Sequence, residues 1–170
     1  MVTLGLDIST SCVGYAFTKD KKILDMGFID IKKEKTPKEK VFQTITILNK
    51  NIFIDEVGII NVEDNLSGFA GGRTSQQVIV KLAKFNAILC FVLEDTFEME
   101  VRNINPMTAR KNVFGKARVK GIKAKEFVKM KIEEMYDTKK WCKTTARGNW
   151  DKRNIDAYDG LVMSLFEKKA

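Results

Sequence analysis

The chain has 170 residues, a size that fits one domain, over residues 1–170, with a hydrophobic core of its own. It contains no histidine, which excludes serine-histidine and cysteine-histidine nucleophiles and histidine-ligated metals. Cys12, Cys90 and Cys142 show no CxxC spacing, so they indicate neither a disulfide framework nor a structural zinc site. Of the catalytic and metal sites considered, those built from carboxylates remain possible.

The net charge of +8 is concentrated in the C-terminal third. Residues 110–153 hold 15 Lys or Arg against five Asp or Glu, a net of +10, which leaves about −2 for the rest of the chain. A basic surface of this kind fits the phosphate backbone of nucleic acids, although solvated lysine-rich surfaces are also common. With no apolar run near ~20 residues and no signal segment, we expect a soluble cytoplasmic protein without a membrane partner.

The first third of the chain predicts a three-stranded meander followed by a helix. Thr36, Pro37 and Glu39 form an N-cap, a proline at the first helical position and a capping glutamate, so a helix is expected over 37–50. Short runs rich in β-formers predict the three strands, over 2–7, 14–17 and 23–31.

The middle of the chain predicts a buried strand and a long helix. The apolar run 58–62 leads directly into Glu63 and Asp64, as expected for a central strand. Thr74 or Ser75 can cap a helix that reaches about Leu93. Its second half is apolar around most of its circumference, which favours burial against another subunit as well as against the sheet.

The remainder predicts a last strand over 99–104, a turn at Asn105-Pro106 and three further helices. These helices are expected over 108–113, 121–136 and, capped by Asn154 or Asp151, up to residue 166. Residues 138–153 are expected to form a basic loop. The order of elements predicts an α/β fold, a mixed sheet with helices packed on it.

Four acidic residues occupy strand ends and a helix face that this fold can bring close together in space. Asp7 and Glu63 each end an apolar strand, and Asp156 and Asp159 are three residues apart on one helix face. Glu63 is preferred over Asp64 because it extends its strand directly. Clustered carboxylates repel unless cations neutralise them, and oxygen-only ligands suit Mg²⁺ or Mn²⁺. Such a site supports two-metal hydrolysis of a phosphodiester. Taken singly, each acid also fits a solvated cap or a residue favoured by the helix dipole.

These residues carry a family resemblance. The segment Leu4-Gly5-Leu6-Asp7-Ile8-Ser9-Thr10 with Gly14-Tyr15, the strand ending in Val62-Glu63, and Asp156-Ala157-Tyr158-Asp159-Gly160 resemble the RuvC-type Holliday junction resolvases in order and spacing over nearly the whole chain. The segment 105–111 and the small size resemble the bacteriophage branch, in which case the compartment would be the host cytoplasm.

The resemblance implies a five-stranded RNase H-like fold and a homodimer that binds a four-way DNA junction and makes paired nicks. It implies two Mg²⁺ per active site, replaceable by Mn²⁺, held by Asp7, Glu63, Asp156 and Asp159. It also implies dimerisation through the apolar helix from residue 75. A catalytic lysine near the start of the helix after the last strand corresponds to Lys120 or Lys123, with Lys120 preferred.

The resemblance also implies DNA contacts outside the carboxylates. The family places an aromatic wedge three residues after the glutamate, where this chain has Leu66, with Phe69 three residues further on. Junction distortion by Phe69 is a hypothesis. The expected DNA-binding residues are Leu66, Phe69, Arg73, Lys111, Lys116, Arg118 and Lys123.

Three other functions compete with a junction resolvase. A sugar-kinase or actin-like ATPase also begins with a strand of this kind, but it needs a duplicated fold, for which 170 residues leave no room. A DNA-binding module without activity would not need all four acids. A nuclease of the same fold with broader specificity, for flaps and forks, is compatible with the missing aromatic at Leu66.

Overall fold

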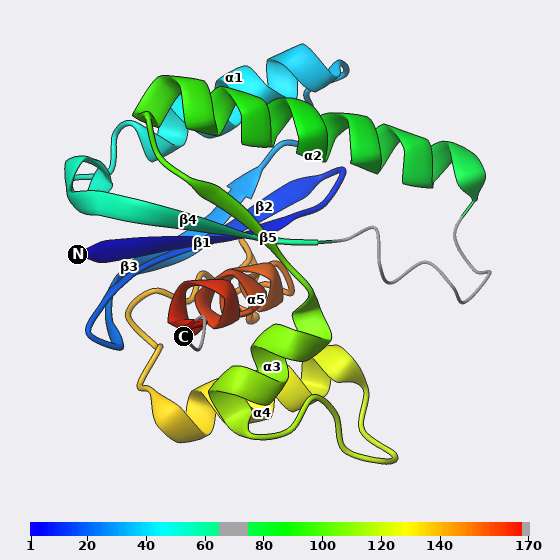
Figure 1. The fold of residues 1–170 in the computed structure, drawn as a ribbon. Helices are drawn as coiled ribbons and strands as arrows, with labels where there is room; N and C mark the ends of the chain where they lie inside the picture. The colour runs from blue at the N-terminus through cyan, green and yellow to red at the C-terminus, as the bar shows by residue number, and fades with distance from the viewer. Residues whose placement is uncertain (65–74, 168–170) are drawn as a thin grey trace.

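The fold is a mixed five-stranded sheet with helices on both faces (Figure 1). The computed structural model describes residues 1–64 and 75–167. The strand order is β3-β2-β1-β4-β5; β1, β2 and β3 form the expected antiparallel meander, and β4 and β5 lie parallel to β1. The bounds are β1 (Val2–Ile8), β2 (Cys12–Lys19), β3 (Lys22–Asp30), β4 (Val57–Glu63) and β5 (Val101–Ile104).

The described helices are divided between the two faces of the sheet (Figure 1). The bounds are α1 (Pro37–Leu48) and α2 (Gln76–Phe97) on the first face, and α3 (Pro106–Phe114), α4 (Ala124–Met135) and α5 (Asn154–Leu165) on the second. Of these, α5 lies directly against β1 and β2, and α3 and α4 pack behind it. The helix predicted from residue 75 extends four residues beyond Leu93.

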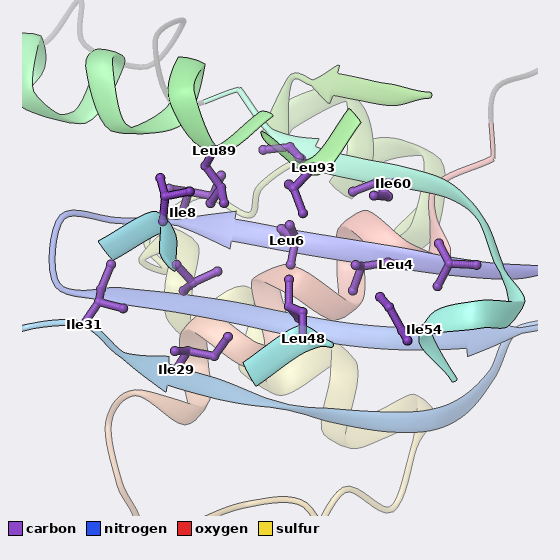
Figure 2. Packing of buried hydrophobic residues seen from close by; sticks show 14 of the residues in the cluster. Leu4, Leu6, Ile8, Ile29, Ile31, Leu48, Ile54, Ile60, Leu89 and Leu93 are labelled. Atoms are coloured by element: carbon purple, nitrogen blue, oxygen red, sulfur yellow. The ribbon is translucent and has the colours of Figure 1, made fainter. Parts of the chain in front are cut away.

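The two faces of β1 serve two separate cores. Leu4, Leu6 and Ile8 belong to the core under α1 and α2, where Figure 2 shows them facing Leu89 and Leu93 of α2. Because side chains alternate along a strand, Gly5 and Asp7 face the opposite side, toward α5. This alternation assigns Asp7 to the α5 face of the sheet.

Local sequence signals account for most helix starts. Thr36 and Glu39 form the predicted capping box at α1, and the Ser75 side chain caps α2. Asn105, expected in a turn, instead caps α3, with Pro106 as its first residue. This fits proline at a first helical position, where its missing N–H costs no hydrogen bond.

The start of α5 differs from the prediction. Its N-cap residue is Arg153, and the side chains of Asp151 and Asn154 are engaged elsewhere. The Asn154 amide donates to the Lys143 carbonyl and accepts from the Lys143 N–H, at 2.8 and 2.9 Å. Asp151 accepts from the guanidinium of Arg153. These hydrogen bonds attach the basic 138–153 segment to the start of the helix that carries Asp156 and Asp159.

Helix α2 is long and apolar enough to span a membrane by length and composition, contrary to the expectation that no segment of the chain would be. In the fold it is a covering helix whose Leu82, Phe85, Leu89 and Leu93 are buried against the sheet. Its outer face leaves Phe91 67% exposed, and Ile88, one turn before it, and Val80, about three turns before it, are also exposed.

Candidate active site

The ends of β1 and β4 bring the first two acids to one level of the sheet. Leu6 of β1 pairs in register with Val62 of β4. The following residues, Asp7, next to last in β1, and Glu63, the last of β4, therefore lie side by side on neighbouring parallel strands. Both side chains are buried. In the described part of the chain neither carboxylate has a hydrogen bond, and Oε2 of Glu63 is fully buried without a partner.

The other two acids reach this edge because α5 lies unusually close to the sheet. A Cβ on Gly5 would overlap the backbone of Gly160, and a Cβ on Gly14 would overlap the carbonyl group of Asp156. The glycines at these two strand positions therefore set how near the helix can approach. The result is that Asp156 and Asp159, both buried on α5, stand next to Asp7 and Glu63.

The four carboxylates are close enough to disturb one another's ionisation. Burial raises the pKa of Asp7 well above its ordinary value, and the charges of Glu63, Asp159 and Asp156 raise it further. Burial, followed by repulsion from Asp159, raises the pKa of Glu63 to about 7, against the opposing effect of Arg110. Burial also raises the pKa of Asp159. Without a cation, the site resists full ionisation at neutral pH.

Two cations from α3 and α4 partly balance this charge. Nζ of Lys125 lies 2.7 Å from Oδ1 of Asp156, and Nη2 of Arg110 lies 3.2 Å from Oδ1 of Asp159. The two pairs differ in exposure, since the Lys125 side chain is 61% exposed while the Arg110 side chain is 10% exposed. Desolvation lowers the pKa of Lys125, but its hydrogen bond to Asp156 and the charges of Asp156, Asp7 and Asp159 together raise it overall.

Neither Lys125 nor Arg110 was predicted from the sequence as a site residue. Helix α4 begins at Ala124 rather than 121, which places Lys125 in its first turn and leaves Lys120 in the preceding turn of the chain. In the described residues neither Lys120 nor Lys123 pairs with a carboxylate. The position of Lys125 at the basic start of an amphipathic helix was a sequence signal that could have indicated a role in the site. No local sequence signal indicated Arg110, because its partner Asp159 is 49 residues away.

The predicted DNA-binding residues divide into two groups. Lys111, Lys116, Arg118 and Lys123 are exposed along α3 and the connection from α3 to α4. Leu66, Phe69 and Arg73 lie outside the described residues.

The donor set fits a hard divalent cation. It is made of carboxylate oxygens alone, and the buried Oε2 of Glu63 lacks any partner within the described chain. Across residues 1–64 and 75–167, however, no three acidic or cysteine side chains already converge as a metal cage. Asp156 and Asp159 instead form ion pairs with Lys125 and Arg110. These two side chains supply positive charge to the carboxylates in the absence of a metal ion.

Comparisons with known proteins identify the fold. No family model matches the chain, and no curated protein sequence matches it. Among solved structures, it is similar to Thermus thermophilus RuvC, with 14% identity over 97% of this chain and 92% of that chain and a TM-score of 0.62. The chain has an RNase H-like fold. The predicted fold class is thereby confirmed.

Two further solved structures agree with this assignment. Thermus thermophilus RuvC in complex with a Holliday junction substrate gives a TM-score of 0.67 at 14% identity, covering 97% of this chain and 91% of that chain. The yeast mitochondrial Holliday junction resolvase Ydc2 gives 0.58 at 14% identity, covering 95% of this chain and 75% of that chain.

Proposed function

We propose that the protein is a metal-dependent endodeoxyribonuclease that resolves four-way DNA junctions by paired nicks. The observation that carries the proposal is the burial of Asp7, Glu63, Asp156 and Asp159 at one edge of an RNase H-like sheet, next to an exposed lysine. The similar solved structures, one of them bound to a Holliday junction, support a junction as the substrate.

The four acids would hold two Mg²⁺ ions, which Mn²⁺ can replace. When bound, the ions would supply charge that stabilises the attacking water as hydroxide and the leaving 3′-oxygen, in a displacement in which the water oxygen bonds to phosphorus as the P–O3′ bond breaks. Burial and mutual repulsion favour protonated forms of Asp7 and Glu63 in the metal-free protein. Metal binding is therefore expected to release protons and to weaken as the pH falls below about 7.

Lys125 is the lysine we assign to the scissile phosphate, in place of Lys120. Its ammonium group contacts Asp156 and still faces solvent, so it can donate to a non-bridging phosphate oxygen next to the metal ligands. Arg110 has a different role because it is buried behind Asp159. It is a positioning residue that holds the Asp159 carboxylate at the edge of the site.

A homodimer would pair the cuts, because a two-fold axis presents two identical sites to two equivalent strands of a junction. The apolar outer face of α2, with Phe91 at its most exposed point, is the surface we assign to this contact. The exposed side chains of Lys111, Lys116, Arg118 and Lys123 would contact the DNA backbone and contribute salt-dependent affinity rather than sequence preference.

A cleavage assay on four substrates tests the proposal. Labelled four-way junction, fork, flap and linear duplex are incubated with the protein in Mg²⁺ and in EDTA. Asp7→Asn removes one proposed ligand, and Asp20→Asn, in the β2–β3 turn at the opposite end of the sheet, is the matched control.

Metal-dependent, symmetric nicks in the junction by the wild type and Asp20→Asn, and none by Asp7→Asn, would support a resolvase. Equal cleavage of fork, flap and junction would instead indicate a broader branched-DNA nuclease. Tight binding without cleavage in any metal would refute the enzymatic proposal, and strong ATP hydrolysis would favour the ATPase alternative.

A further inference from the structure

A cavity lined by both charged and apolar side chains opens between α1 and α2, outside the carboxylate site. Its volume is about 380 Å³, within the range of ligand-binding pockets, and residues of the described chain form its walls. The walls come from the β1–β2 turn, the loop before α1, the first turn of α1 and the N-terminal half of α2. The lining residues are Thr10, Glu34, Lys35, Pro37, Lys40, Val78, Lys81 and Phe85.

The cavity lies at the same edge of the sheet as the carboxylates, but on the opposite face. Thr10 is in the turn that directly follows β1, three residues after Asp7. Asp7 faces α5, whereas Ile8 belongs to the core on the side of α1 and α2, where the cavity lies. The ammonium group of Lys40 donates to the carbonyl of Thr10 and so ties α1 to this turn. A strand of DNA that crosses this edge would pass from the carboxylates to the cavity.

The charge of the lining favours an anion. Lys35, Lys40 and Lys81 contribute three positive charges, and Glu34 contributes the one negative charge. Within residues 1–64 and 75–167, none of these three lysines forms an ion pair. Lys35 and Lys81 are exposed, so their ammonium groups are available to a ligand.

An apolar wall completes the cavity. Phe85, which is buried near the middle of α2, lines the cavity together with Val78 and the lysines. A nucleotide offers the matching combination, a charged phosphate joined to an apolar deoxyribose face. Sulfate-sized anions need only the charge, whereas the combined lining suits a phosphate that belongs to a chain.

We propose that this cavity binds a backbone phosphate of the DNA strand that leaves the carboxylate site. This inference rests on the proposed nuclease function, since it takes DNA as the ligand, and it adds a contact outside the basic C-terminal third. The phosphate would be bound by Lys35 and Lys81, while Lys40 links it to the turn that follows Asp7. Contacts of this kind position the strand and carry no sequence information.

The double variant Lys35→Gln/Lys81→Gln tests the proposal against a matched control. Lys22→Gln/Lys50→Gln removes two exposed lysines, likewise without ion pairs in the described chain, from the opposite end of the sheet. Binding of four-way junction DNA is measured for each protein in Ca²⁺ or EDTA, from about 50 to about 200 mM salt. Cleavage in Mg²⁺ is measured separately.

Loss of one phosphate contact reduces the slope of log affinity against log salt by about 0.9. The wild type should therefore lose about 3.5-fold more affinity than Lys35→Gln/Lys81→Gln across this salt range, and the control should match the wild type. Glu34→Gln, which removes the acid of the lining, is expected to tighten binding at low salt.

Equal slopes for the wild type and Lys35→Gln/Lys81→Gln would overturn the cavity as a phosphate site, even if the junction is cut as proposed. A reduced slope in a protein that binds DNA but never cuts it would support the cavity and refute the proposed enzymatic function. Failure of the wild type to bind DNA would refute both.

Discussion

Replacing Glu63 with glutamine probes the electrostatic cost of gathering four carboxylates without metal. In the folded protein, burial and neighbouring charges raise the pKa of Glu63 from an ordinary 4.5 to about 7. At about 1.4 kcal/mol per pKa unit, keeping this carboxylate ionised costs the folded state up to roughly 3 kcal/mol. Glutamine has nearly the same shape and carries no charge, so the variant should be more stable than the wild type in EDTA at about pH 8.

The pH dependence fixes the sign of this effect. Between 4.5 and about 7 the folded state binds the Glu63 proton and the unfolded chain releases it. The contribution of Glu63 to stability is therefore fully present below 4.5 and is lost as the pH rises through about 7. The advantage of Glu63→Gln should be largest above pH 7 and should shrink toward about pH 5.

Thermal and urea unfolding in EDTA measure the difference directly. For a protein of this size, roughly 3 kcal/mol corresponds to about 6–12 °C in Tm, which is the upper limit expected. Glu94→Gln, on the exposed side of α2, is the control and should show no such pH-dependent gain. Added Mg²⁺ should stabilise the wild type and have little effect on Glu63→Gln. A variant no more stable than the wild type at about pH 8 would refute the reasoning.

Three further changes have distinct expected outcomes. Lys125→Met should lower single-turnover cleavage by about 10²–10³-fold with little loss of junction binding, and an equal loss in Lys120→Met would contradict the assignment of Lys125. Gly14→Ala places a Cβ into the carbonyl group of Asp156, so it should lower the urea midpoint and abolish cleavage; wild-type values for both would show that α5 can shift freely. Phe91→Glu should yield monomers in sedimentation and lose paired nicking, and an unchanged sedimentation coefficient would exclude this face of α2 from the dimer.

Local sequence patterns determined the strands of the sheet and the starts of α1 and α2. The apolar runs that end in Asp7 and Glu63 became adjacent parallel strands, and the capping box at Thr36 formed as predicted. These signals succeed because they depend on neighbours within a few residues. The start of α5 was wrong for the opposite reason: Asn154 is bound to Lys143, 11 residues away, and is not free to cap.

The resemblance and the strand ends pointed to four acids, but the sequence could not say what balances their charge. Lys125 and Arg110 reach Asp156 and Asp159 across 31 and 49 residues, through the packing of α4 and α3 around α5. The local periodicity of the sequence does not predict contacts between residues so far apart in the chain. The sequence alone therefore determined which carboxylates end at this edge. Only the tertiary structure decided which cations meet them, because these contacts depend on how separate helices pack on one sheet.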